Sequence, residues 1–127
     1  MKDNPSCFSD GSGGSIVLVN STSGYFGATG VSGYISSKHG VTGLLRSSQL
    51  WADKYKVRVN AVAPFVTPGG ALADGFAKQW QAQGLPSNSP ELVANVVATL
   101  AMDSSTKGEC YLVSPLLKLL WPMLRPA

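Results

Sequence analysis

The chain contains three short runs rich in β-branched residues, and these runs constrain its fold most strongly. They are SIVLVN at residues 15–20, VRVNAV at 57–62 and CYLV at 110–113. The first run is unbroken and bounded by turn residues, which is typical of a strand buried on both faces of a parallel sheet rather than of a half-exposed strand. We therefore expect three strands, the first of them covered on both faces.

Helical patterns separate these runs. From Tyr34 to about Lys54 there is no proline, and apolar residues recur at helical spacing: Val41, Leu44, Leu45, Leu50 and Trp51. A second helix is expected at about 72–83, and a third begins at Pro90, a favoured first helical position. Strands that alternate with helices indicate an α/β protein with a parallel sheet. Three strands are few for a sheet of this kind.

The length of 127 residues suits one compact domain. Residues 1–14 are polar and rich in glycine and serine, so we interpret them as a loop. Residues 15–113 hold all the expected strands and helices, and 114–127 form an apolar tail in which Pro122 prevents one continuous helix. We favour packing of this tail against protein over contact with a membrane surface.

The composition argues against several classes of function. Lysine and arginine are scattered without a basic run and the net charge is only +3, so we expect no nucleic-acid binding. Only two cysteines occur, Cys7 and Cys110, no signal-peptide pattern opens the chain, and there is no stretch of about 20 apolar residues. These features predict a cytoplasmic protein without a transmembrane helix. His39 has no second ligand near it, so we expect no metal site.

Tyr34 and Lys38 lie four residues apart on the expected helix and therefore share one of its faces. A free tyrosine hydroxyl has a pKa of about 10, and a nearby ammonium group stabilises the phenolate, so such a pair suits proton transfer near neutral pH. The spacing alone is weak evidence, because an exposed helix pair has the same pattern. Ser21 adds context: it follows the first strand at its carboxyl end, where ligands bind in open parallel sheets.

Together with their flanking segments, these residues resemble the short-chain dehydrogenase/reductase family. The similar segments are GGSIVLVNSTSG, GYISSKHGVTGLLRS and VRVNAVAP, and the resemblance covers roughly residues 13–113, which correspond to the C-terminal half of the family's domain. It implies that Ser21, Tyr34 and Lys38 are catalytic. Tyr34 would be the acid/base, Ser21 would orient the substrate carbonyl, and Lys38 would stabilise the phenolate of Tyr34.

The same resemblance implies a cofactor, NAD or NADP, and a small carbonyl or alcohol substrate. Hydride would pass between the nicotinamide and a secondary alcohol or ketone. The cofactor-binding residues would be Tyr34, Lys38, Pro64, Val66 and Thr67, and the substrate would meet Ser21, Ser23, Tyr25 and Tyr34. Residues 68–88 would cover the substrate, with Phe76 or Trp80 lining that segment.

The sequence also departs from the family pattern. The Gly-rich loop that opens the family's domain and cradles the pyrophosphate is missing, since Gly11–Gly14 precede a strand rather than a helix. The family's Pro-Gly step is here Pro64-Phe65. We therefore expect a partial Rossmann-type, doubly wound parallel sheet in three α/β/α layers, lacking the N-terminal nucleotide-binding half.

Two functions follow from this pattern. The first is an NAD(P)-dependent oxidoreductase of the short-chain type, and the second is a truncated, catalytically silent fragment acting at most as a partner subunit. In either case the helix at 34–54 would form a homo-oligomer interface, as it does in the family.

Overall fold

The computed structural model describes residues 13–27, 30–69 and 73–115, so residues 1–12 of the loop expected at 1–14 and most of the apolar tail lie outside the described residues. Three strands form one parallel sheet in the order β1-β2-β3. The strands are β1 (Gly14–Val19), β2 (Val57–Pro64) and β3 (Cys110–Val113). The helices are η1 (Thr22–Gly24), α1 (Ser32–Ser47), α2 (Gln49–Lys54), α3 (Ala73–Ala82) and α4 (Pro90–Met102).

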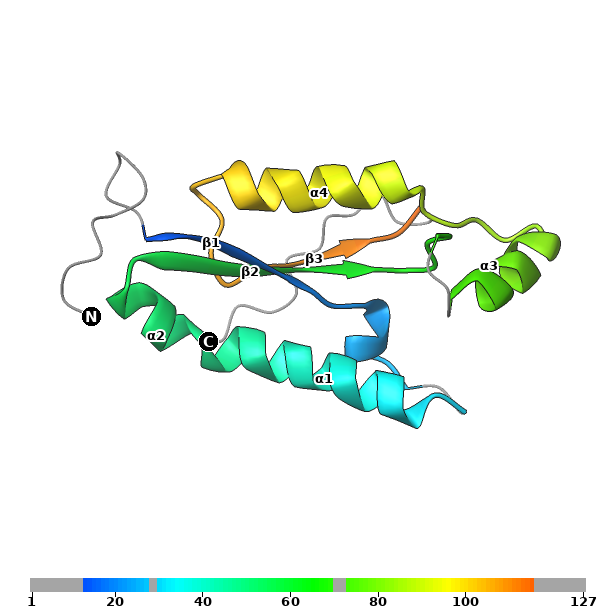
Figure 1. Ribbon diagram of the computed structural model, residues 1–127, viewed down its shortest axis with the longest axis horizontal. Coiled ribbons are helices and arrows are strands. Elements are labelled where there is room, and N and C mark those ends of the chain that lie inside the picture. The colour runs from blue at the N-terminus through cyan, green and yellow to red at the C-terminus, as the bar shows by residue number, and fades with distance from the viewer. Residues whose placement is uncertain (1–12, 28–29, 70–72, 116–127) are drawn as a thin grey trace.

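The sheet lies between two layers of helices, as expected of a three-layer α/β protein. Helices α1 and α2 cover one face and α4 covers the other (Figure 1). Each face has its own core: one contains Leu45, Ala52, Val59, Ala61, Ala63, Cys110 and Leu112, and the other contains Val62, Leu100 and Val113. The carboxyl ends of the strands lie on the right in Figure 1, where η1, the start of α1, α3 and the start of α4 also lie.

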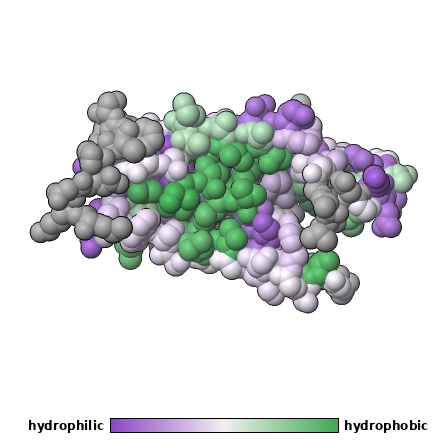
Figure 2. All heavy atoms as spheres, in the orientation of Figure 1, coloured by the Kyte–Doolittle hydropathy of each residue, from purple (hydrophilic) through white to green (hydrophobic). Residues whose placement is uncertain are grey.

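Strand β1 is less buried than its sequence predicts. Ile16 is 41% and Val19 is 59% exposed, whereas the middle of β2 is fully buried. The reason is position: in the described part of the chain β1 pairs only with β2, so it is an edge strand. The expectation of a first strand buried on both faces is therefore wrong for this chain. Figure 2 shows that apolar side chains gather over the middle of the viewed face.

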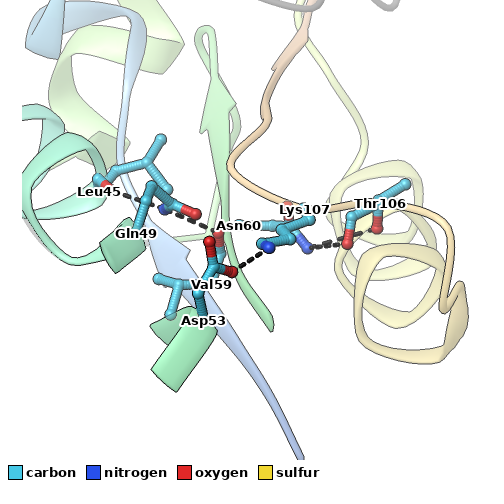
Figure 3. Close-up of polar contacts among 7 residues, drawn as sticks. All are labelled: Leu45, Gln49, Asp53, Val59, Asn60, Thr106 and Lys107. Carbon is cyan, nitrogen blue, oxygen red and sulfur yellow. Dashed lines mark hydrogen bonds and ion pairs between the residues drawn. The ribbon is translucent and has the colours of Figure 1, made fainter. Parts of the chain in front are cut away.

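The helix expected at 34–54 is two helices that meet at Ser48. The carbonyl of Leu45 accepts hydrogen bonds from Ser48 Oγ (3.1 Å) and Gln49 Nε2 (2.7 Å), and Gln49 Nε2 also reaches the carbonyl of Val59 (3.3 Å; Figure 3). Side chains that bind backbone carbonyls in this way compete with the helical hydrogen bonds. The first helix also begins earlier than expected, at Ser32.

The start of α4 follows the sequence prediction. Ser89 is its N-cap, and Ser89 Oγ accepts a hydrogen bond from the backbone N–H of Leu92 (3.2 Å). Pro90 occupies the first helical position and Glu91 lies in the first turn, where the helix dipole favours an anion.

Arg58 fastens β2 to the carboxyl end of α4. Its guanidinium donates hydrogen bonds to the carbonyls of Leu100 (3.1 Å), Ala101 (2.8 Å) and Asp103 (2.6 Å). The last carbonyls of a helix have no partner within the helix, and a cation beside them is favourable. This single side chain therefore caps α4 and fixes it over the sheet.

Buried Asn60 and an ion pair brace the same, amino-terminal end of the sheet (Figure 3). Asn60 Nδ2 donates to the carbonyl of Thr106 (3.1 Å), and Lys107 pairs with Asp53 of α2.

The described helices include none that is both long and apolar enough to cross a membrane. Within the described ranges, no three histidine, cysteine, aspartate or glutamate side chains gather as metal ligands would.

Replacing Arg58 with methionine should lower the free energy of unfolding by about 2–3 kcal/mol, because charge-assisted hydrogen bonds to α4 are lost while the aliphatic stem is kept. Urea unfolding of the purified variant measures this change. Arg46→Met is the matched control, since Arg46 is exposed on α1. Equal losses in the two variants would show that Arg58 contributes no more than an exposed surface charge.

Candidate active site

Ser21 lies at the carboxyl end of β1 and is held by two hydrogen bonds. It is the N-cap of η1, and its Oγ accepts from the backbone N–H of Ser23 (3.2 Å). The same hydroxyl donates a long hydrogen bond to the carbonyl of Pro64 (3.5 Å), the last residue of β2. The side chain is therefore buried where two strand ends meet, as expected of a residue at a ligand-binding edge.

Lys38 reaches the same strand end from α1. Its Nζ donates a hydrogen bond to the carbonyl of Val19 (2.9 Å), two residues before Ser21. It also lies over the ring of Tyr34, 5.6 Å from the ring centroid. The lysine thus links the exposed tyrosine on α1 to the end of β1.

A second lysine–tyrosine pair shows which of these contacts is informative. Lys54 Nζ also lies 5.6 Å from a ring centroid, that of Tyr55. Tyr34 and Tyr55 are each 49% exposed. The ring contact therefore does not distinguish Tyr34 from an ordinary surface tyrosine, whereas the bond of Lys38 to the end of β1 does.

A buried polar contact fixes the loop after β1 against α1. Asn20 Nδ2 donates to Thr42 Oγ1 (2.9 Å), and the Thr42 hydroxyl donates to the carbonyl of Gly24 (3.0 Å). Gly24 itself has no room for a side chain, since a Cβ there would lie 2.8 Å from the carbonyl oxygen of Lys38 and would overlap the amide of Asn20. The backbone of η1 therefore lies directly against the turn of α1 that carries Lys38.

The sequence did not single out Asn20 or Thr42. Two signals were present: Asn20 is a polar residue at the end of an apolar run, and Thr42 lies one turn after Lys38. A buried polar group needs a partner, so a polar residue next to a buried strand is a reasonable candidate for such a contact.

The two remaining substrate candidates differ in position. Ser23 lies in η1 and its backbone N–H is used by Ser21. Tyr25 packs against the core beneath α1. Burial, together with a side-chain hydrogen bond with Cys110, raises the pKa of Tyr25 to about 12, so this hydroxyl stays protonated at neutral pH. The structure thus places Tyr25 in packing, and its contact with substrate stays a prediction.

Three of the five expected cofactor residues, Pro64, Val66 and Thr67, lie together at the end of β2, whereas Tyr34 and Lys38 lie on α1. Phe65 N–H donates to the carbonyl of Val113 (2.8 Å), which ties the loop to β3, and Thr67 Oγ1 donates to the carbonyl of Phe65 (2.8 Å). The carbonyl of Val66 accepts from the backbone N–H of Asn88 (2.8 Å), a residue that the sequence did not single out. Pro64 therefore contacts Ser21 directly, while Val66 and Thr67 are held by Asn88 and Phe65.

Aromatic side chains join this loop to the segment at 68–88. Phe65 meets Trp80 edge to face with ring centroids 5.3 Å apart, and Phe76 lies 5.8 Å from Trp80. Trp80 Nε1 donates to the carbonyl of Pro86 (2.9 Å), which fixes the indole. Phe65, which stands in place of the expected glycine, thus anchors the loop to α3.

Thr42→Val should lower the free energy of unfolding by about 1–3 kcal/mol, because the carbonyl of Gly24 and the amide of Asn20 lose a partner inside the protein. Urea unfolding checks the value. Thr99→Val is the matched control: Thr99 Oγ1 also bonds a helix carbonyl, that of Asn95, but on an exposed surface. A loss at Thr42 no larger than that at Thr99 would contradict the assigned role of the contact.

Comparisons with known proteins point to one family. A model of the short chain dehydrogenase family matches residues 4–81, a span that contains Ser21, Tyr34 and Lys38. The chain is 37% identical to cyclohexanol dehydrogenase from Acinetobacter sp. (strain SE19) over 107 residues, covering 80% of this chain and 42% of that protein.

Solved structures show the same fold. The 3-hydroxyacyl-CoA dehydrogenase type-2 of Mycobacterium avium matches with a TM-score of 0.71 and 26% identity, over 88% of this chain and 44% of that one. A 4-hydroxyisoleucine dehydrogenase complexed with NADH matches with a TM-score of 0.64 and 24% identity, over 78% of this chain and 44% of that one. The sheet is therefore Rossmann-like.

The chain spans less than half the length of these relatives. The family model ends at residue 81, short of the roughly 13–113 over which the sequence resembles the family, while the match to the Mycobacterium avium structure covers 88% of the chain. Because the model matches more than half of the residues, the chain belongs to the short-chain dehydrogenase family.

Proposed function

We propose that this chain is the catalytic, C-terminal half of an NAD(P)-dependent oxidoreductase that interconverts a secondary alcohol and a ketone. The observation that carries the proposal is the bond from Lys38 Nζ to the carbonyl of Val19. It brings the lysine and the neighbouring Tyr34 of α1 to the end of the strand after which Ser21 lies, and it has no counterpart at the otherwise similar Lys54–Tyr55 pair.

In this proposal Tyr34 exchanges a proton with the substrate oxygen. Its hydroxyl would donate the proton when a ketone is reduced and would accept it when an alcohol is oxidised. The ammonium of Lys38 lies 5.6 Å from the centroid of the Tyr34 ring, where its charge would offset negative charge that develops during proton transfer. Ser21 would donate a hydrogen bond to the same substrate oxygen. Its hydroxyl hydrogen would turn to the substrate from the long contact with the Pro64 carbonyl (3.5 Å), while the N–H of Ser23 keeps Oγ in place.

The residues present fit the nicotinamide end of NAD or NADP. Lys38 offers a cation at the end of β1, and the loop of Pro64, Val66 and Thr67 starts at the end of β2, where the Pro64 carbonyl contacts Ser21. Asn88 Oδ1 is buried next to that loop and has no partner among the described residues. When bound, the cofactor supplies or accepts the hydride.

The pyrophosphate end would be held elsewhere. Neither the loop from β1 to α1 nor the one that follows β2 has the G-x-G-x-x-G spacing that binds it. We propose that an N-terminal half supplies that function; the chain covers only 42% of the cyclohexanol dehydrogenase, which is consistent with a further part. The location we propose is the cytoplasm, on the basis of the low cysteine content and the free buried thiol of Cys110.

One observation favours the second candidate, a catalytically silent fragment that pairs with a full-length subunit. Ile16 and Val19 of the edge strand are exposed, so β1 offers an apolar surface and an unpaired edge to another chain. Catalysis by the chain itself separates the two candidates.

Tyr34→Phe should reduce the oxidation of NADH or NADPH with cyclohexanone as probe by about 100-fold or more, since general acid–base catalysis contributes about 10²–10⁴-fold. The decrease in absorbance of the reduced nicotinamide measures the rate. Tyr55→Phe is the control and should keep the parent rate, because Tyr55 has the same exposure and the same lysine contact.

The outcomes are distinct. Equal rates for Tyr34→Phe and the parent would contradict the role of Tyr34. A parent chain that binds neither NADH nor NADPH would favour the silent fragment.

We also propose that the protein is a homo-oligomer through α1 and α2. Leu44, Leu50 and Trp51 are exposed apolar residues on these helices, and an apolar surface of this kind is typical of an interface.

Leu50→Glu should therefore shift the protein towards the monomer in analytical ultracentrifugation, since the new carboxylate would have to be buried. Met102→Glu is the control: Leu50 is 86% and Met102 84% exposed, but Met102 lies at the end of α4 on the other face. A monomeric parent, or an equal shift in both variants, would overturn the proposed interface.

A further inference from the structure

We infer that Asn88 is a positioning residue that holds the loop after β2 in the shape a nicotinamide cofactor requires. The inference rests on the function proposed above and adds a residue to it. Asn88 lies in the connection before α4, more than twenty residues after the loop, and it carries no role in the resemblance to the family.

The amide of Asn88 is buried among acceptors. The residue is 2% exposed, and its Nδ2 donates to the carbonyl of Val113 (2.9 Å). The same nitrogen reaches Thr67 Oγ1 (3.3 Å) and the carbonyl of Phe65 (3.4 Å). Two of these partners are carbonyls, which only accept, and the Thr67 hydroxyl already donates to Phe65. The surroundings therefore require an NH₂ group at this place.

The backbone of Asn88 contributes a further contact. Its N–H donates to the carbonyl of Val66 (2.8 Å), so Asn88 touches each of the three residues that follow Pro64. The contact with Val113 ties them to the end of β3, and Ser89, the next residue, caps α4. One residue thus connects the loop, a strand end and a helix start.

The contacts of Asn88 affect cofactor binding because they restrict the conformations that the loop after β2 can adopt. Residues 65–69, which follow β2, contain no helix or strand. A loop that is loose before binding must be ordered by the ligand, which weakens binding without changing the chemical step. Loss of the Asn88 amide should therefore raise KM for the cofactor and leave kcat nearly unchanged.

Asn88→Asp tests the role with no change in volume, because it replaces the donating NH₂ by an oxygen facing the same acceptors. Asn60→Asp is the matched control. Asn60 is equally buried at 0% exposed and donates in the same way to Thr106, but at the amino-terminal end of the sheet. The two variants lose comparable hydrogen bonds, and only one of them touches the loop.

Hydrogen–deuterium exchange is the first readout and needs no cofactor. In Asn88→Asp the amides of residues 65 and 88 should exchange about tenfold faster or more, because their partners are Val113 and Val66. In Asn60→Asp these two amides should be unchanged, while the turn at 106–109 exchanges faster. Unchanged exchange at residue 65 in Asn88→Asp would overturn the inference.

Steady-state kinetics with NADH and cyclohexanone is the second readout. We expect KM for NADH to rise about tenfold in Asn88→Asp with kcat within twofold of the parent, and neither to change in Asn60→Asp. An active parent with the same KM in both variants would overturn the role of Asn88 alone. A parent that neither binds nor oxidises NADH or NADPH would overturn the proposed function and the cofactor role with it, whereas exchange still decides whether Asn88 holds the loop.

Thr67→Val is a milder second variant for the case in which Asn88→Asp does not fold. It removes one acceptor of the Asn88 amide and keeps the amide itself. We expect faster exchange at residue 88 and a smaller rise in KM. No change in either quantity would count against the inference.

Discussion

The hydrogen bond from Asn20 to Thr42 determines how the strand that leads to Ser21 meets the helix that carries Tyr34 and Lys38. It is short and buried, and it joins segments far apart in the sequence. The missing side chain of Gly24 lets the backbone of η1 reach α1 at this level. Since a buried amide without a partner is costly, the sheet and α1 have one favourable relative position here rather than a range of them.

Polar side chains hold both ends of the sheet while its middle is apolar. At the amino end, Arg58 and Asn60 bind the carbonyls that follow α4. At the carboxyl end, Asn20 and Asn88 bind the loops that surround the candidate site. The apolar middle supplies most of the driving force for folding, but it is non-directional. The directional hydrogen bonds at the ends are what give the loops defined shapes.

The sequence predicted the strands and the order of the elements well because both depend on local composition. It failed on the burial of β1, which depends on how many strands lie beside it, and on the break at Ser48, where side chains take the carbonyl of Leu45. Spacing drew attention to the Tyr34–Lys38 pair and the end of a strand to Ser21, while their catalytic roles came from the resemblance to the family and stay predictions. Asn88 was not, because its partners Phe65 and Val113 are more than twenty residues away in either direction.

Lys38 donates a hydrogen bond to the carbonyl oxygen of Val19, an atom that in a sheet would ordinarily accept one from a neighbouring strand. The backbone N–H of Asn20 points to β2, so the carbonyl of Val19, one residue earlier, faces the open side of β1. A neighbouring strand on that side would supply a backbone donor to the same oxygen and so compete with the lysine. Completion of the sheet and the freedom of this ammonium to turn towards Tyr34 are therefore linked equilibria, each of which shifts the other by the same free energy.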